Sequence, residues 1–215
     1  MTIADIDTLQ LCSLLNTTAF GVVFLLLWNG RRQESYLLHW SISSLLYAVV
    51  MIGFRLWGEH GIVVTTGLLM LLAWCNVMAV TGLRHFERLP VFEPWMAVPP
   101  LLIGAAHALP LIMQQSGWLP PASHIPKIGD VIGLTLAMAI SGGKMIAGPL
   151  RGQRIAGGAM LAYIPAFLLA LIGDIGVLSG AQSLGVLPLL ADQALLVILN
   201  LGGVANITAI GSDGA

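Results

Sequence analysis

The chain has 215 residues, of which 57% are hydrophobic and only 9% are charged. An average soluble domain carries roughly 25% charged residues, so this chain has too little polar surface to cover a core in water. The high apolar content excludes a disordered or collagen-like chain. The net charge of −1 argues against a nucleic-acid partner, because a protein that binds nucleic acid needs a basic surface. We therefore predict an integral membrane protein whose first partner is the lipid bilayer.

Seven stretches of the sequence could each form a helix across the hydrocarbon layer, which needs about 20 mostly apolar residues. The predicted spans are about 8–29, 36–57, 61–83, 94–115, 127–148, 155–179 and 184–206. Short segments rich in Gly, Pro or charge separate them. The seventh span is the least regular, because Asp192, Asn200 and Gly202 interrupt it. The predicted fold class is all-α: one polytopic membrane domain over residues 1–215, built as a bundle of seven transmembrane helices.

Basic residues fall mainly in alternate loops of this arrangement. Seven of the nine Lys and Arg residues lie in the first, third and fifth loops: Arg31, Arg32, Arg84, Arg88, Lys144, Arg151 and Arg154. Because basic loops stay in the cytoplasm, we expect the N-terminus outside and the C-terminus in the cytoplasm. The first residues include Asp5 and Asp7 and no basic residue, which does not match a cleavable signal peptide.

Ionisable side chains inside the predicted spans are the candidate functional residues. The insertion free energy of such a side chain is unfavourable by about 2.5–3.5 kcal/mol at the middle of the bilayer. Its presence in a span therefore indicates a function. Asp174, Asp192, Asp130 and His107 all fall in the outer half of their spans. Tyr163 precedes Asp174 by about three helical turns and so shares its helix face. Together they predict an outward-facing pocket for a small ligand, a proton or a cation.

A packing role is the alternative for the same residues. A carboxylate near the interface can extend into the headgroup layer or form a hydrogen bond to a neighbouring helix. This alternative is preferred for Asp130 and His107, whereas both interpretations stay open for Asp174 and Asp192, which we expect to approach each other. The run of small residues at 157–162 likewise predicts close helix packing.

Catalytic and cofactor chemistry is not expected. Asp130 and Asp174 stand in KIGD and LIGD, which lack the first Gly of the GxGD pattern of intramembrane aspartyl proteases. His39 and His107 are predicted at opposite halves of the bilayer, so they do not form a haem-binding pair. No spacing typical of a metal site is present. We expect no cofactor, no metal and no enzymatic activity.

The arrangement of basic residues and spans resembles a known family. Its features are Arg31-Arg32 after the first span, the segment Gly82-Leu83-Arg84-His85-Phe86-Glu87-Arg88 at the end of the third, and a cytoplasmic C-terminus. The pattern resembles the N-terminal membrane module of bacterial signalling proteins that carry a GGDEF diguanylate cyclase or histidine kinase domain. This resemblance implies a bacterial inner-membrane location and a cytoplasmic signalling domain or partner protein. The sequence holds no GGDEF, DxLT or kinase histidine motif, so the resemblance implies sensing without catalysis.

A second resemblance covers a short segment near the C-terminus. The residues from Asn200 to Thr208, NLGGVANIT, resemble the NxGGxAN(I/L)T segment of anhydro-N-acetylmuramic acid kinases. The rest of that kinase fold is absent, so kinase activity is not expected. The predicted function is an outward-facing sensory or input module for signal transduction. Two alternatives stay open: a small transporter or channel subunit that uses intramembrane carboxylates, and a structural subunit of a membrane complex.

Overall fold

The structure, a computed structural model, describes residues 3–57, 61–86, 88–120, 124–148 and 151–162, together with 164–165, 167–168 and 171–172. Every regular element among these residues is a helix, which confirms the predicted all-α class. The chain divides into two compact units, Met1–Gly104 and Ala105–Ala215. This division does not test the predicted single membrane domain over residues 1–215, which stays a prediction.

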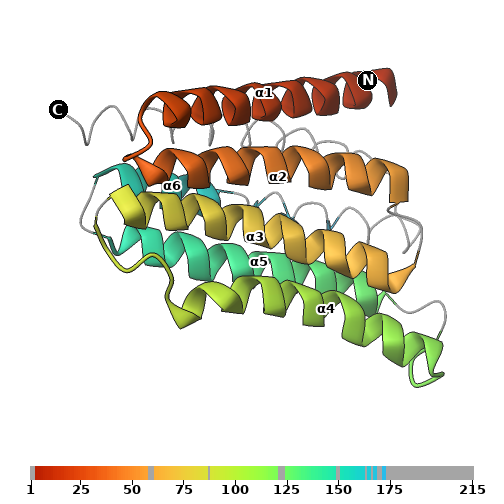
Figure 1. Ribbon diagram of the computed structural model, residues 1–215. Coiled ribbons are helices and arrows are strands. Elements are labelled where there is room, and N and C mark those ends of the chain that lie inside the picture. The colour runs from red at the N-terminus through yellow and green to blue at the C-terminus, as the bar shows by residue number, and fades with distance from the viewer. Residues whose placement is uncertain are drawn as a thin grey trace. The chain divides into compact units, whose positions relative to one another are not determined.

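The first unit is a sequence of long helices with short connections. It contains α1 (Ile3–Gly30), α2 (Ser35–Trp57), α3 (Ile62–Phe86), the 3₁₀-helix η1 (Pro94–Ala97) and the beginning of α4 (Val98–Gln115). The middle helix, α2, packs against both α1 and α3 (Figure 1). Because only a few residues separate α1 from α2 and α2 from α3, each of these helices reverses direction and packs beside its predecessor.

Polar side chains of α2 connect it to the backbones of both neighbouring helices. The donors are two serines and a tryptophan: Ser41 donates to the Gly21 carbonyl, Ser43 to Cys75 and Trp40 to Ala79, at 2.8, 2.7 and 3.2 Å. In lipid the hydrophobic effect does not drive helices together, so such bonds and close packing hold the helices. These contacts therefore fix the position of α2 between α1 and α3.

The Ser41 bond is a small but measurable contribution to stability. Replacing Ser41 by Ala is expected to lower the unfolding free energy by about 0.6 kcal/mol, the average for interhelical hydrogen bonds in a membrane protein. Unfolding in mixed detergent micelles measures this change. Ser44→Ala on the same helix is the matched control and should have no such effect. A loss no larger for Ser41→Ala than for Ser44→Ala would contradict the prediction.

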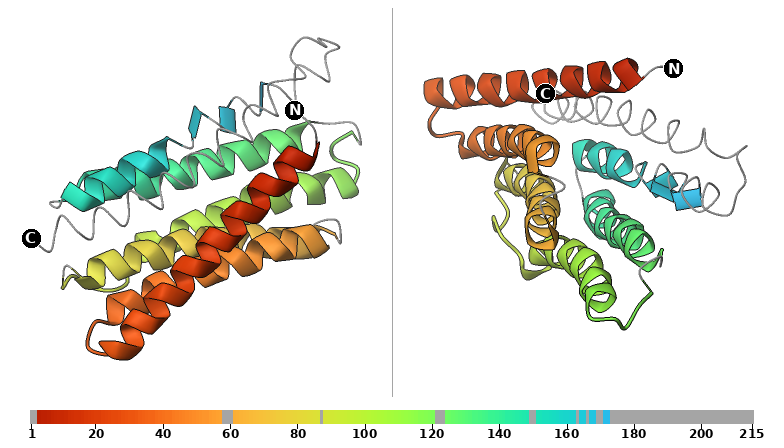
Figure 2. Two further views of the ribbon diagram at one scale, coloured as in Figure 1. Left: turned by 90° about the horizontal axis from the view of Figure 1, so that it is seen from above. Right: turned by 90° about the vertical axis from the view of Figure 1, so that its right-hand side faces the viewer.

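The second unit begins within α4 and contains α5 (Ile125–Ile146) and α6 (Arg151–Leu161). Pro126 lies in the first turn of α5, where a missing backbone N–H costs no helical hydrogen bond. Helices α5 and α6 lie side by side (Figure 2). A Cβ atom built on Gly157 would lie 2.6 Å from the carbonyl oxygen of Gly142, so the two backbones are in contact. The predicted close packing of the 157–162 run is thus confirmed at Gly157.

Within the described residues, four helices are long and apolar enough to cross a membrane: Ser35–Trp57, Ile62–Phe86, Pro94–Gln115 and Ile125–Ile146. Their bounds agree with the second to fifth predicted spans to within a few residues. In α1, the segment Leu14–Gly30 is a shorter apolar helix in the place of the first predicted span. The sixth prediction, 155–179, overlaps α6 (Arg151–Leu161) at its beginning, and most of its remainder lies outside the described residues. The seventh, 184–206, lies outside the described residues.

Candidate functional site

Two of the candidate residues predicted from the sequence meet in the second unit. His107 lies on α4 and Asp130 on α5, and the Nδ1 atom of His107 is 2.7 Å from Oδ1 of Asp130. His107 is 8% exposed, whereas about a third of the Asp130 side chain is accessible. The contact therefore joins a buried imidazole to a half-buried carboxylate across two helices that are both long and apolar enough to cross a membrane.

The local sequence explains why α4 and α5 approach at this point. Pro110 lies inside α4 and has no backbone N–H, so it cannot donate the helical hydrogen bond to the carbonyl of Ala106. That carbonyl faces Gly129, because a Cβ atom at Gly129 would be 2.6 Å from it. The residues that follow Ala106 and Gly129 are His107 and Asp130. A proline on one helix and a glycine on the other thus bring the two ionisable side chains together.

The chemistry of the pair follows from its hydrogen bond. An ionised carboxylate only accepts, so Asp130 in that form holds the hydrogen of His107 on Nδ1 and leaves Nε2 with a lone pair. The Nε2 atom is buried and has no hydrogen-bond partner among the described residues. The pair can hold one proton, with Nε2 bare, or two, with Nε2 protonated. It is therefore a site that can take up a proton or a hydrogen-bond donor.

The other predicted site residues cannot be compared with this pair. Tyr163, Asp174 and Asp192 lie outside the described residues, so the predicted approach of Asp174 to Asp192 stays a prediction. Taken one at a time in the sequence, His107 and Asp130 were each predicted to have a packing role. Counting from the turn between the two helices would have placed both at similar depth on adjacent antiparallel spans. That count was the missed signal.

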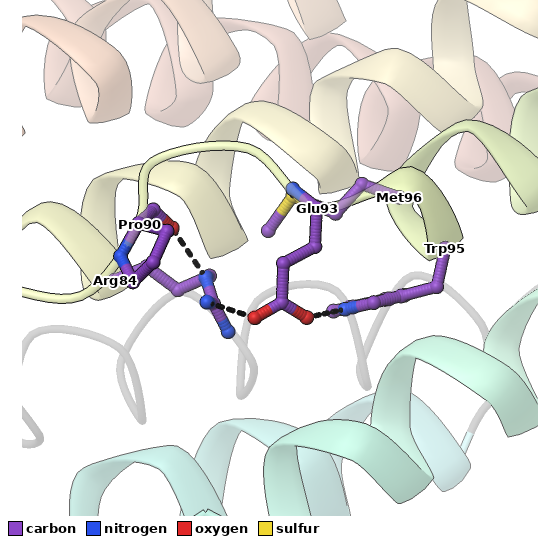
Figure 3. Close-up of polar contacts among 5 residues, drawn as sticks. All are labelled: Arg84, Pro90, Glu93, Trp95 and Met96. Carbon is purple, nitrogen blue, oxygen red and sulfur yellow. Dashed lines mark hydrogen bonds and ion pairs between the residues drawn. The ribbon is translucent and has the colours of Figure 1, made fainter.

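A second polar cluster lies at the end of α3 in the first unit (Figure 3). Arg84 donates from Nε to the carbonyl of Pro90 at 2.8 Å and forms an ion pair with Glu93. The other carboxylate oxygen of Glu93 accepts a hydrogen bond from the indole of Trp95. The backbone N–H of Glu93 points at the sulfur of Met96, which is completely buried. Because the Arg84 side chain is only 14% exposed, this network holds the α3–η1 connection in one conformation.

Two histidines also meet between α2 and α3. The rings of His39 and His85 have their centroids 5.5 Å apart, and Nδ1 of His39 is 2.8 Å from the carbonyl of Ser35. The sequence pattern gave no indication that His39 pairs with His85. Aromatic contacts surround this end of the helices, and they join Phe24 to Trp40, Trp40 to Tyr36, and Tyr36 to Phe86.

A zinc site in a protein usually has three or four side-chain ligands. Among the side chains that the structure describes, no three His, Cys, Asp or Glu residues lie together so that they could hold a metal ion. The histidine pair and the His107–Asp130 pair each provide two such groups. The chemistry these pairs support without further ligands is proton binding and hydrogen bonding.

No family model, curated protein or solved structure matches this chain. The resemblance to membrane modules of bacterial signalling proteins therefore rests on the sequence features alone, and so does the resemblance of the 200–208 segment to a kinase.

Proposed function

We propose that this protein is a membrane-embedded sensory module, with no catalysis of its own, in which the His107–Asp130 pair receives the signal. The full arrangement is seven transmembrane helices in a bacterial inner membrane, with the N-terminus outside and the C-terminus in the cytoplasm. In this orientation the pair lies toward the outer side, and the signal passes to a cytoplasmic domain or partner. The signal itself is a proton or a small molecule that donates a hydrogen bond to Nε2 of His107.

The observation that carries this proposal is the buried Nε2 atom of His107, which has no hydrogen-bond partner among the described residues. A polar atom left unsatisfied in a low-dielectric interior costs free energy, and polar groups within a membrane mark functional sites. Histidine is also the side chain whose charge normally changes between about pH 5 and pH 8. A sensor requires a site whose state changes when the signal binds. The Nε2 atom of His107 meets this requirement, because a proton or a ligand would satisfy its hydrogen bonding.

The pair can transmit a signal because it joins two helices. Adding a proton to Nε2 converts a neutral imidazole beside a carboxylate into an ion pair across α4 and α5. A packing of α4 and α5 that shortens the His107–Asp130 contact is then favoured over one with a longer contact. The population therefore shifts toward the tighter packing. The remaining titratable side chains on α4 and α5 are Lys127, near the same end of α5, and Lys144, near the other end, while His124 precedes α5.

A reporter experiment tests the proposal. A dimerisation reporter is fused after Ala215, and its output is recorded over an external pH range of about 5 to 8. The pH response of the wild type should be lost in both His107→Gln and Asp130→Asn. Thr135→Val is the matched control, since the buried Thr135 hydroxyl also has no partner among the described residues. This variant should respond like the wild type.

Two outcomes would overturn the sensory proposal. Equal pH and ligand responses in the wild type and both pair variants would leave His107 and Asp130 as packing residues. Proton flux into proteoliposomes that is lost in Asp130→Asn would instead identify the transporter alternative, because a relay must pass protons across the bilayer rather than only bind them.

A further inference from the structure

The connection between α3 and η1 presents apolar side chains to its surroundings. Leu89 and Val91 are each 39% exposed and Phe92 is 52% exposed. We call residues 88–92 the elbow. It follows α3 after a single residue and precedes η1 by one, and both helices belong to segments that are long and apolar enough to cross a membrane. The elbow is therefore placed at the edge of the hydrocarbon layer, where lipid headgroups begin.

The elbow is held in one shape and is not a loose chain. Arg84 binds the Pro90 carbonyl and the Glu93 carboxylate (Figure 3). The Leu89 N–H donates to the Arg84 carbonyl at 2.9 Å. Arg88 has a φ of 58°, a left-handed conformation that is uncommon for any residue other than glycine. A network that holds such a conformation orders the exposed side chains in advance, so binding through them costs little conformational entropy.

The charge of the elbow indicates its partner. Arg84 is occupied by Pro90 and Glu93, whereas Arg88 is exposed and its side chain has no partner among the described residues. The elbow thus carries one available guanidinium beside three apolar side chains. A guanidinium forms charge-assisted hydrogen bonds to phosphate, and exposed apolar side chains beside it fit the upper acyl chains. A protein partner would need a polar rim around the apolar residues, and the adjoining polar groups, Arg84 and Glu93, are already paired to each other.

We propose that the elbow inserts into the headgroup layer of an anionic leaflet. Arg88 binds a lipid phosphodiester, and Leu89, Val91 and Phe92 enter the acyl boundary. This inference goes beyond the sensory function and does not depend on it. A basic residue near an anionic surface contributes about 1 kcal/mol, so loss of Arg88 should weaken retention of anionic lipid roughly fivefold.

Nanodiscs of defined composition provide the test and do not depend on which way the protein is oriented. A spin label is attached at Phe92→Cys in a variant whose Cys12 and Cys75 are replaced by Ala. In discs of phosphatidylglycerol the label should be shielded from a water-soluble relaxation agent and accessible to oxygen. Shielding should decrease in phosphatidylcholine discs and in Arg88→Gln, and Arg88→Lys should restore most of it.

Arg31→Gln is the control for Arg88→Gln, and two outcomes of the labelling experiment would contradict the proposal. Arg31→Gln removes another exposed arginine of the same unit, one that is paired with Glu34, and should leave the label unchanged. A label open to water in both lipids would overturn the proposal and identify the elbow as a surface for a soluble partner. Equal shielding in both lipids and in Arg88→Gln would also overturn it, because the headgroup would then play no part.

Discussion

Replacing Gly157 by alanine is expected to lower the unfolding free energy by about 1–3 kcal/mol, the usual cost of an extra methyl group in a packed interior. The added Cβ atom would lie 2.6 Å from the carbonyl oxygen of Gly142 and 2.8 Å from the backbone nitrogen of Ile146. Neither atom belongs to a flexible side chain, so the change forces α5 and α6 apart. Thermal or detergent-induced unfolding in micelles measures the loss.

The neighbouring glycine is a matched control for this effect. A Cβ atom at Gly158 meets nothing within 4 Å, and the residue lies on the same helix. Gly158→Ala should therefore be neutral or should stabilise α6 by up to about 1 kcal/mol, because alanine favours the helix over glycine. The same comparison holds on α5 between Gly142→Ala and Gly143→Ala. Equal effects at Gly157 and Gly158 would show that the backbones are not in contact there.

Removing one member of the His107–Asp130 pair is expected to cost more stability than removing both. His107→Leu leaves the carboxylate without its partner, and Asp130→Leu leaves the buried imidazole unpaired, each at about 1–3 kcal/mol. The double variant replaces both polar groups with apolar ones and should recover at least about 1 kcal/mol relative to either single variant. A double-mutant cycle on unfolding free energies measures this coupling.

A distant residue on α5 provides the control for the double-mutant cycle. Ser141 is buried on α5, eleven residues after Asp130 and about 16 Å along the helix axis. Ser141→Ala combined with His107→Leu should be additive within about 0.5 kcal/mol. Additivity of His107→Leu with Asp130→Leu as well would mean that the hydrogen bond between them contributes nothing to the fold.

The positions of the helices could be predicted because they depend on local composition. A span needs about 20 apolar residues, and the stretches 36–57, 61–83, 94–115 and 127–148 are delimited by short segments rich in charged, Gly or Pro residues. The first turn of α6 precedes the predicted sixth span, because Arg151–Leu161 opens with polar residues. A helix can begin in polar residues before the apolar stretch, so hydropathy gives no indication of its first turn.

The sequence by itself determined an all-α chain with helices long and apolar enough to cross a membrane. It also marked His107 and Asp130 as costly residues there, because the transfer of a polar group into hydrocarbon depends on the residue and its depth. Only the tertiary structure decided that these two residues bind each other, that Gly157 contacts Gly142 and that Arg84 is paired with Glu93. Such contacts depend on the rotation of each helix about its axis. That rotation is set by the fit of the surfaces of neighbouring helices. An example is the contact of Gly129 with the Ala106 carbonyl, which has no helical donor because of Pro110. A single segment of sequence does not encode such a fit.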